Sequence, residues 1–163
     1  MKSNKMNKKI IKPVFNTIEE FLKTFSLEEL SSKIIEKRKK YFMVNSSLNE
    51  ISEKIPIDYF YAGTFLGHVK KNIFYPSIAL IDLIPESYEN TLVLDSKLEW
   101  LFLCGRDIFK ESLETKSPKG YIVIKNNKNE ILGLGFSKQN LILNILDRGD
   151  FLRRESTKKK IKK

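Results

Sequence analysis

Residues 120–146 read GYIVIKNNKNEILGLGFSKQNLILNIL, and this stretch decides the fold of the C-terminal half. It contains three short apolar segments, which are typical of strands, at residues 121–125, 131–136 and 141–146. The polar run 126–129 separates the first two segments, and its asparagines tolerate the left-handed conformation that hairpin turns need. The stretch therefore predicts a hairpin followed by a third strand.

Further strands and one helix surround this stretch. Residues 92–94 are apolar and predict a strand, and Ser96-Lys97-Leu98-Glu99 is a capping box that predicts the start of a short helix. Gly105 predicts the end of that helix. The helix would bury Leu98, Leu101 and Phe102, and further strand-like segments lie at 108–113 and 151–154. Several short strands with one helix predict a small barrel.

The N-terminal half predicts a mixture of helices and strands. Thr17 and Ser26 are positioned to cap two amphipathic helices. Residues 47–50 form another capping box, for a helix that ends before Pro56. Residues 41–44 and 59–69 indicate strands, with Gly63 and Gly67 at bulge or turn positions, whereas 78–84 fits either a strand or a helix.

The polar stretch 85–90 separates apolar runs and is where we place a domain boundary. The predicted fold class is α+β, with an N-terminal mixed α/β domain at residues 1–90 and a C-terminal barrel at 91–163. A basic arm, 1–12, opens the first domain, and a basic tail, 156–163, closes the second.

Composition excludes several classes of protein. The chain has 163 residues, 41% hydrophobic and 31% charged, which suits one or two compact domains. Its one cysteine, Cys104, excludes an intramolecular disulfide, and with the one histidine, His68, it cannot build a nitrogen–sulfur zinc site. The sequence has neither a bilayer-length apolar run nor the apolar stretch of a signal peptide, so we expect a cytoplasmic protein without a metal or a membrane partner.

Charge is the strongest compositional signal. Lysine and arginine number 30 against 20 aspartates and glutamates, and the net charge of +10 favours an anionic partner, most commonly nucleic acid. Both ends of the chain are rich in lysine, for which the alternative interpretation is a pair of solvated ends.

Two arginines stand apart from these ends. Arg153 and Arg154 follow the apolar Phe151 and Leu152 directly, so we expect them on an ordered element. Neighbouring residues of a strand face opposite ways, so one of the two arginines can share a face with Phe151 and the other cannot. The alternative to RNA contact is an ion pair with Asp150 or Glu155.

The order of elements carries a resemblance to a known module. It lies in Val93-Leu94-Asp95, the capped helix through Phe102, Gly105, the strand at 120–124, and Leu132-Gly133-Leu134-Gly135. Together these segments resemble a PUA domain, the RNA-binding module named after pseudouridine synthases and archaeosine transglycosylases, which implies a pseudo-β-barrel.

A wider resemblance covers residues 39–155. It is carried by GTFLG at 63–67, the apolar run up to Ile84, and GDFLRRE at 149–155. Here the chain is similar to the archaeal type of the Nip-seven (nuclear import protein seven) family of ribosome-biogenesis factors. The resemblance implies an N-terminal α/β domain followed by a PUA domain.

The resemblance also implies a function. It indicates a protein that is not an enzyme and needs no cofactor, and that acts in large-subunit assembly and pre-rRNA processing. Arg153, Arg154 and Lys160 match basic RNA-binding positions, and Lys158 stands beside Thr157, where another basic residue is expected. The implied partners are single-stranded pre-rRNA, U-rich or A-rich among family members, and assembly proteins at the N-terminal domain. We expect a monomer.

Two further arginines and two glutamates are weaker candidates for function. Arg106 and Arg148 are secondary candidates for RNA contact, because guanidinium groups bind phosphate bidentately and stack on bases. Glu111 and Glu114 could form a catalytic pair, but nothing places them in a cleft, so we expect solvated carboxylates.

Catalytic interpretations are weak elsewhere too. No triad signature surrounds His68, which we interpret as a hydrogen-bonding residue, and Cys104 as a small buried side chain. Gly133 and Gly135 lack the third glycine of a dinucleotide fingerprint and indicate close packing in the barrel. Two alternatives stay open: an accessory of an RNA-modification enzyme, and a translation-associated PUA protein.

Overall fold

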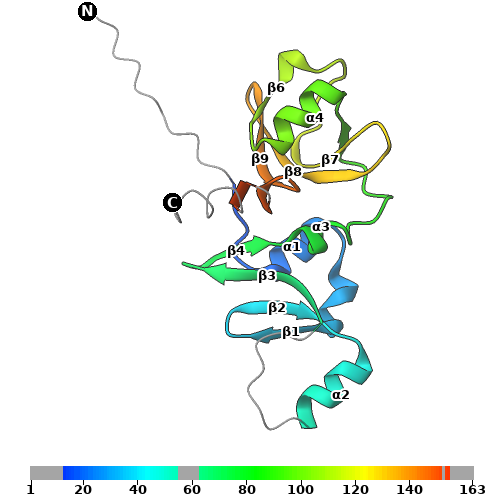
Figure 1. The fold of residues 1–163 in the computed structure, drawn as a ribbon, viewed down its shortest axis with the longest axis vertical. Helices are drawn as coiled ribbons and strands as arrows, with labels where there is room; N and C mark the ends of the chain where they lie inside the picture. Colours follow the sequence, from blue (N-terminus) through cyan, green and yellow to red (C-terminus); the bar gives the residue numbers. More distant parts are fainter. Residues whose placement is uncertain (1–12, 55–62, 152, 155–163) are drawn as a thin grey trace, which may run out of the picture.

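The structure, a computed structural model, describes residues 13–54, 63–151, 153 and 154. They form two β-sheets with short helices between and beside them (Figure 1). The N-terminal elements are α1 (Ile18–Thr24), the 3₁₀ helix η1 (Glu28–Lys33), β1 (Ile34–Lys37), β2 (Lys40–Met43), α2 (Ser46–Lys54), β3 (Thr64–Lys70), β4 (Ile73–Pro76) and α3 (Ile78–Ile81). The C-terminal elements are β5 (Thr91–Val93), α4 (Ser96–Leu103), β6 (Ile108–Phe109), the 3₁₀ helix η2 (Lys110–Ser112), β7 (Gly120–Lys125), β8 (Ile131–Lys138) and β9 (Leu141–Asp147).

The N-terminal sheet has the order β1-β2-β3-β4 with every pair antiparallel. It confirms the strand predicted at 41–44, and the strand predicted at 59–69 is β3 from Thr64 onward, while residues 59–62 lie outside the described part. In β3 a bulge leaves Leu66 without a counterpart on β2, because Tyr41 pairs with Gly67 and Phe42 pairs with Phe65. Gly67 has φ +154°, and a Cβ there would lie 2.5 Å from the Tyr75 carbonyl oxygen. The predicted bulge position is thus confirmed.

The first helix follows the sequence prediction, and the second does not. The Thr17 hydroxyl accepts a hydrogen bond of 3.2 Å from the Glu20 amide, which caps α1 as predicted. Ser26 caps nothing: it has φ +56°, and the 3₁₀ turn after it gives way to β1 at Ile34. The reason is a tight hairpin: Arg38 and Lys39 have φ +52° and +61°, and the two-residue turn that they form pairs the β-branched Ile34 and Ile35 with strand β2.

The other helices begin at polar caps near the predicted ones. Asn45, and not Ser47, caps α2 by accepting a 2.8 Å hydrogen bond from the Leu48 amide. Asp95, and not Ser96, caps α4 with Oδ1 2.8 Å from the amide nitrogens of both Lys97 and Leu98. The actual cap lies two residues before the predicted one in α2 and one residue before it in α4, and carboxylates and amides cap as well as hydroxyls.

The structure also decides residues 78–84 and the end of α4. Residues 78–84, which fitted either a strand or a helix, contain α3, whose first turn is capped by the Ser77 hydroxyl. Gly105 ends α4 as predicted: it has φ +79°, its amide donates to the Phe102 carbonyl at 2.8 Å, and the Arg106 amide donates to the Leu101 carbonyl at 3.2 Å.

The C-terminal sheet has the order β5-β7-β8-β9-β6, and β5 is parallel to β7. It curls into a half-barrel against which α4 packs (Figure 1). The predicted turn at 126–129 is confirmed, since Asn126 Oδ1 accepts from the amides of Lys128 and Glu130, each at 3.0 Å. The strand predicted at 108–113 is wrong beyond Phe109, where η2 replaces it.

Close packing explains two glycines of this sheet. A Cβ on Gly133 would lie 2.1 Å from the Leu146 carbonyl oxygen, and one on Gly135 would lie 2.8 Å from Cγ2 of Ile142. The close packing predicted for both residues is confirmed.

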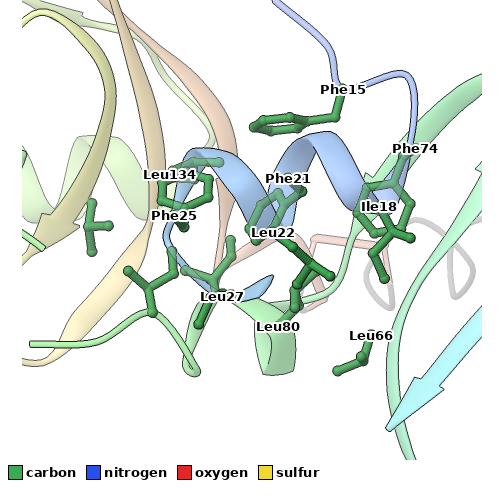
Figure 2. Packing of buried hydrophobic residues seen from close by; sticks show 13 residues of the cluster. Phe15, Ile18, Phe21, Leu22, Phe25, Leu27, Leu66, Phe74, Leu80 and Leu134 are labelled. Atoms are coloured by element: carbon green, nitrogen blue, oxygen red, sulfur yellow. The ribbon is translucent and has the colours of Figure 1, made fainter. Parts of the chain in front are cut away.

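The described residues form two hydrophobic clusters, one inside the half-barrel and one that joins the two sheets. Strand β7 alternates, so Ile122 and Ile124 point into the half-barrel while Val123 faces the N-terminal elements. Figure 2 shows Phe21 of α1 and Phe25, the residue just after this helix, in the same cluster as Val123, which also contains Leu134 of β8. Helix α1 therefore packs between the halves.

Aromatic rings and an ion pair complete this junction. Phe15 stacks on Tyr121 with ring centroids 4.5 Å apart. The Tyr88 hydroxyl donates to the Tyr121 carbonyl at 3.3 Å, and Arg148 forms an ion pair with Asp82 at the end of α3. The division into domains at 85–90 stays a prediction.

Candidate nucleic-acid interface

The two candidate arginines lie on a helical turn that follows β9. The sequence predicted a strand at 151–154, but Asp150, Phe151, Arg153 and Arg154 are helical, and the Arg153 amide donates to the Gly149 carbonyl at 3.1 Å. The strand prediction is wrong at the described residues, because the chain turns at Arg148 and Gly149 directly after β9 and continues as a helical turn, which the Arg153–Asp147 ion pair holds. In Figure 1 this red turn lies between the half-barrel and β4.

Arg153 holds this turn to the half-barrel. Its Nη1 and Nη2 donate to the two carboxylate oxygens of Asp147, each at 2.8 Å, and Nη1 also donates to the Leu103 carbonyl at the end of α4. The Asp147 side chain is 2% exposed, and that of Arg153 is 37% exposed. The hydrogen bond to Asp147 raises the pKa of Arg153 above its ordinary value, so the guanidinium stays charged.

Two glycines make room for the Arg153 guanidinium. A Cβ on Gly105 would lie 3.0 Å from Cζ of Arg153. A Cβ on Gly149 would lie 2.0 Å from the Leu103 carbonyl oxygen and 2.8 Å from Nη1 of Arg153. The slot exists because neither position carries a side chain.

Arg154 points the other way. Its side chain is 73% exposed, and Nη2 lies 2.6 Å from Oδ2 of Asp150, one helical turn earlier. An exposed i,i+4 pair of this kind contributes little stability, so the guanidinium is available to a competing phosphate. The ion pair with Asp150 that the sequence offered as the alternative to RNA contact is present for both arginines, at 2.6 Å for Arg154 and at 3.7 Å for Arg153, and Glu155 lies outside the described residues.

The other predicted residues lie at different places. Arg148 bridges the halves: it pairs with Asp82, and its Nε donates to the Ile131 carbonyl. Arg106 is exposed just after the end of α4. Lys158 and Lys160 lie outside the described residues.

A groove of about 650 Å³ runs beside the helical turn, between β4 and the end of β9. Arg148, Arg153 and Arg154 line its C-terminal wall together with Phe151. Phe65, His68 and Tyr75 line its N-terminal wall. The structure thus brings three of the predicted arginines to one groove.

Sequence reasoning missed the aromatic wall. Phe65 and His68 are three residues apart in a strand, which ordinarily places them on opposite faces, and the bulge at Leu66 puts them on the same face. The signal that could have found them is Gly67 beside an aromatic-rich strand, because a predicted bulge shifts the alternation by one residue.

His68 has an electropositive environment. Burial lowers its pKa, and the charges of Lys70, Arg154 and Lys40 lower the pKa further. The imidazole is therefore neutral near pH 7.

The cysteine and the two glutamates considered for catalysis lie on the surface. Cys104 is exposed, which corrects the expectation of a buried thiol, because it is the last residue before the turn at Gly105 and faces away from the α4 core. Glu111 and Glu114 are exposed on and after η2. Among the residues that the structure describes, no group of three histidines, cysteines or acids could hold a metal. No helix in the same ranges is long and apolar enough to cross a membrane.

Comparison with known proteins covers both halves of the chain. A family model described as the NIP7/UPF0113 pre-PUA domain matches residues 4–78, and one described as the UPF0113 PUA domain matches residues 90–156. A UPF0113 protein of Archaeoglobus fulgidus is 30% identical over 112 residues, which cover 60% of this chain. The match spans 64% of that relative's length, slightly less than two thirds. Because both models match in the family's order, the chain belongs to the NIP7/UPF0113 family, with a pre-PUA region followed by a C-terminal PUA domain.

Proposed function

We propose that this protein is an RNA-binding ribosome-biogenesis factor without catalytic activity, which acts in large-subunit assembly and pre-rRNA processing. The observation that carries the proposal is the exposed Arg154 guanidinium at the edge of a groove next to a PUA half-barrel. The PUA family match and the net charge of +10 support an RNA partner.

Within this site the arginines have different roles. Arg154 binds the phosphate backbone directly, since its exposed pair with Asp150 is easily exchanged. Arg153 is a positioning residue, because its contacts to Asp147 and Leu103 hold the turn that carries Arg154. Arg148 and Arg106 extend the basic surface, and Lys158 and Lys160 add general attraction.

Further parts of the proposal concern the whole protein. The pre-PUA region, residues 1–90, recruits ribosome-assembly proteins, and the PUA domain, 91–163, holds single-stranded pre-rRNA. The protein acts as a monomer in the cytoplasm. The alternative functions are an accessory role beside an RNA-modification enzyme and a translation-associated role, in which binding to protein dominates.

The test is binding of a fluorescent single-stranded RNA to the full chain over a series of salt concentrations. Arg154→Ala should weaken binding several-fold and reduce the log–log salt slope by about 0.7, the value for one phosphate contact on a single strand. Lys128→Ala is the matched control, since this exposed lysine lies in the β7–β8 turn and does not line the groove. Equal effects of the two variants, or wild-type protein that does not bind RNA, would overturn the proposal.

A further inference from the structure

An aromatic row crosses the N-terminal sheet on the side that faces the groove. The bulge places Phe65 and His68 on one face, and His68 pairs directly with Tyr75 on β4. The Phe65 and His68 rings are 17° from parallel with centroids 6.3 Å apart, and the His68 and Tyr75 rings are 15° from parallel at 5.3 Å. Three rings on two strands therefore share nearly one orientation.

The row ends at rings that are open to solvent. Tyr75 is 43% exposed, and Phe151 across the groove is 70% exposed. By contrast, Phe74, the neighbour of Tyr75, points to the opposite face and is 2% exposed in the core. The rings of Tyr75 and Phe151 thus remain uncovered at the groove, although β4, the strand that carries Tyr75, buries the ring of Phe74.

Charge identifies the kind of ligand that this groove suits. The charged groups that shift the pKa of His68 are Lys70, Arg154 and Lys40, all cations. The acids lining the groove, Asp147 and Asp150, are each paired with an arginine. Parallel rings beside cations suit unstacked nucleobases joined by phosphates, since every base has a π face and stacking needs no particular sequence.

We infer that Phe65, His68 and Tyr75 form a stacking surface for unpaired nucleobases, placed so that the backbone of the same RNA strand reaches Arg154. The inference rests on the proposed function and deepens it: the pre-PUA sheet contributes to the RNA site directly. Tyr75 is the outermost ring and receives the first base. Phe65 and His68 hold its orientation from the inner side of the row.

The experiment compares two probes with the same phosphate backbone. One is a single-stranded oligouridylate or oligoadenylate, and the other is an abasic oligomer of equal length and charge. Tyr75→Leu should weaken binding of the RNA about tenfold, within the range for loss of one stacked base, and should leave the abasic probe unaffected. Tyr75→Phe keeps the ring and should bind like the wild type. Trp100→Leu is the matched control, because Trp100 is 65% exposed on α4 and does not line the groove.

His68 supplies an independent signal because it is the one histidine of the sequence. Its ring protons should shift in NMR spectra when the RNA binds, through the ring current of a stacked base, and shift much less with the abasic oligomer. Melting temperatures of the variants establish that they are folded.

The outcomes separate this inference from the proposed function. If Tyr75→Leu binds RNA like the wild type while Arg154→Ala does not, the stacking surface is wrong and the proposed function stands. If Tyr75→Leu weakens both probes equally, the ring acts through the fold, and the inference also fails. If the wild type does not bind RNA but binds an oligoglutamate peptide through Tyr75, the groove is a binding site for a protein partner, and both proposals are wrong.

Discussion

Removing the Arg153 side chain should destabilise the fold far more than removing its neighbour. Arg153→Ala leaves the Asp147 carboxylate, 2% exposed, without its bidentate partner, and leaves the Leu103 carbonyl without the guanidinium donor. Breaking a fully buried ion pair costs about 3–5 kcal/mol. The Arg153 side chain is 37% exposed, so water reaches the vacated slot and we expect about 2–3 kcal/mol. For a chain of this size that lowers the melting temperature by about 5–10 °C.

The assay is urea and thermal denaturation of matched variants. Arg154→Ala removes an equal charge from an exposed pair and should cost about 0.5 kcal/mol or less. Asp147→Asn combined with Arg153→Ala removes the buried charge together with its partner, so the double variant should be more stable than Arg153→Ala alone.

Two results would refute this reasoning. The first is an Arg153→Ala protein that has the melting temperature of the wild type but loses RNA affinity. Arg153 would then be a ligand-binding residue and not a positioning residue. The second is a double variant with Asp147→Asn that shows no recovery, because the cost would then come from lost packing and not from an unpaired carboxylate.

Two further predictions concern other parts of the fold. Burial, with a smaller effect of Glu20, raises the pKa of Tyr121 to about 12; the unfolded phenol ionises near 10, so stability should fall between pH 10 and pH 12 by at most about 1.4 kcal/mol per pH unit. In the Tyr121→Phe variant the free energy of unfolding, measured by urea denaturation at several alkaline pH values, should fall less steeply with pH. A pH dependence equal to that of the wild type would contradict the burial of the phenol. Gly149→Ala places a Cβ 2.0 Å from the Leu103 carbonyl oxygen and should cost about 1–3 kcal/mol in urea denaturation, as overpacking does. A stability equal to the wild type would show that the slot around Arg153 is loose.

The parts of the fold that were predictable are those set by neighbouring residues. Strands β7, β8 and β9 follow from short apolar segments and from asparagine in the turn, and Gly105 ends α4 because its left-handed conformation suits glycine. The prediction failed at β1, where a turn decides the structure. Ile34 lies four residues after Leu30, which is a helical spacing, but the two-residue turn at Arg38 and Lys39 folds the chain into a hairpin and pairs Ile34 with β2. Arginine and lysine are not typical of the positive φ that this turn needs, so the turn carries no sequence signal.

The candidate site was predictable to a similar extent. Charge and family resemblance led to the C-terminal arginines, but the groove depends on two strands from the other half of the chain. Phe65 and His68 could not be assigned to one face without knowing that Leu66 lies unpaired in a bulge. The burial of Asp147 likewise depends on tertiary structure, since nothing in the local sequence separates this carboxylate from that of Asp150, which is 31% exposed.

One conclusion about Arg153 and Arg154 holds although the predicted element was wrong. On a strand, neighbouring side chains point in opposite directions, and on a helix they point about 100° apart, so either geometry separates two adjacent arginines. Which of them turns inward is decided by the buried carboxylate of Asp147 at the end of β9, together with the slot between Gly105 and Gly149. Fixing Arg153 there holds the turn by contacts to Asp147 and Leu103 and leaves Arg154 to face solvent. A pair of arginines therefore supplies one anchor and one exposed charge, and neither alone would place a cation firmly at the groove.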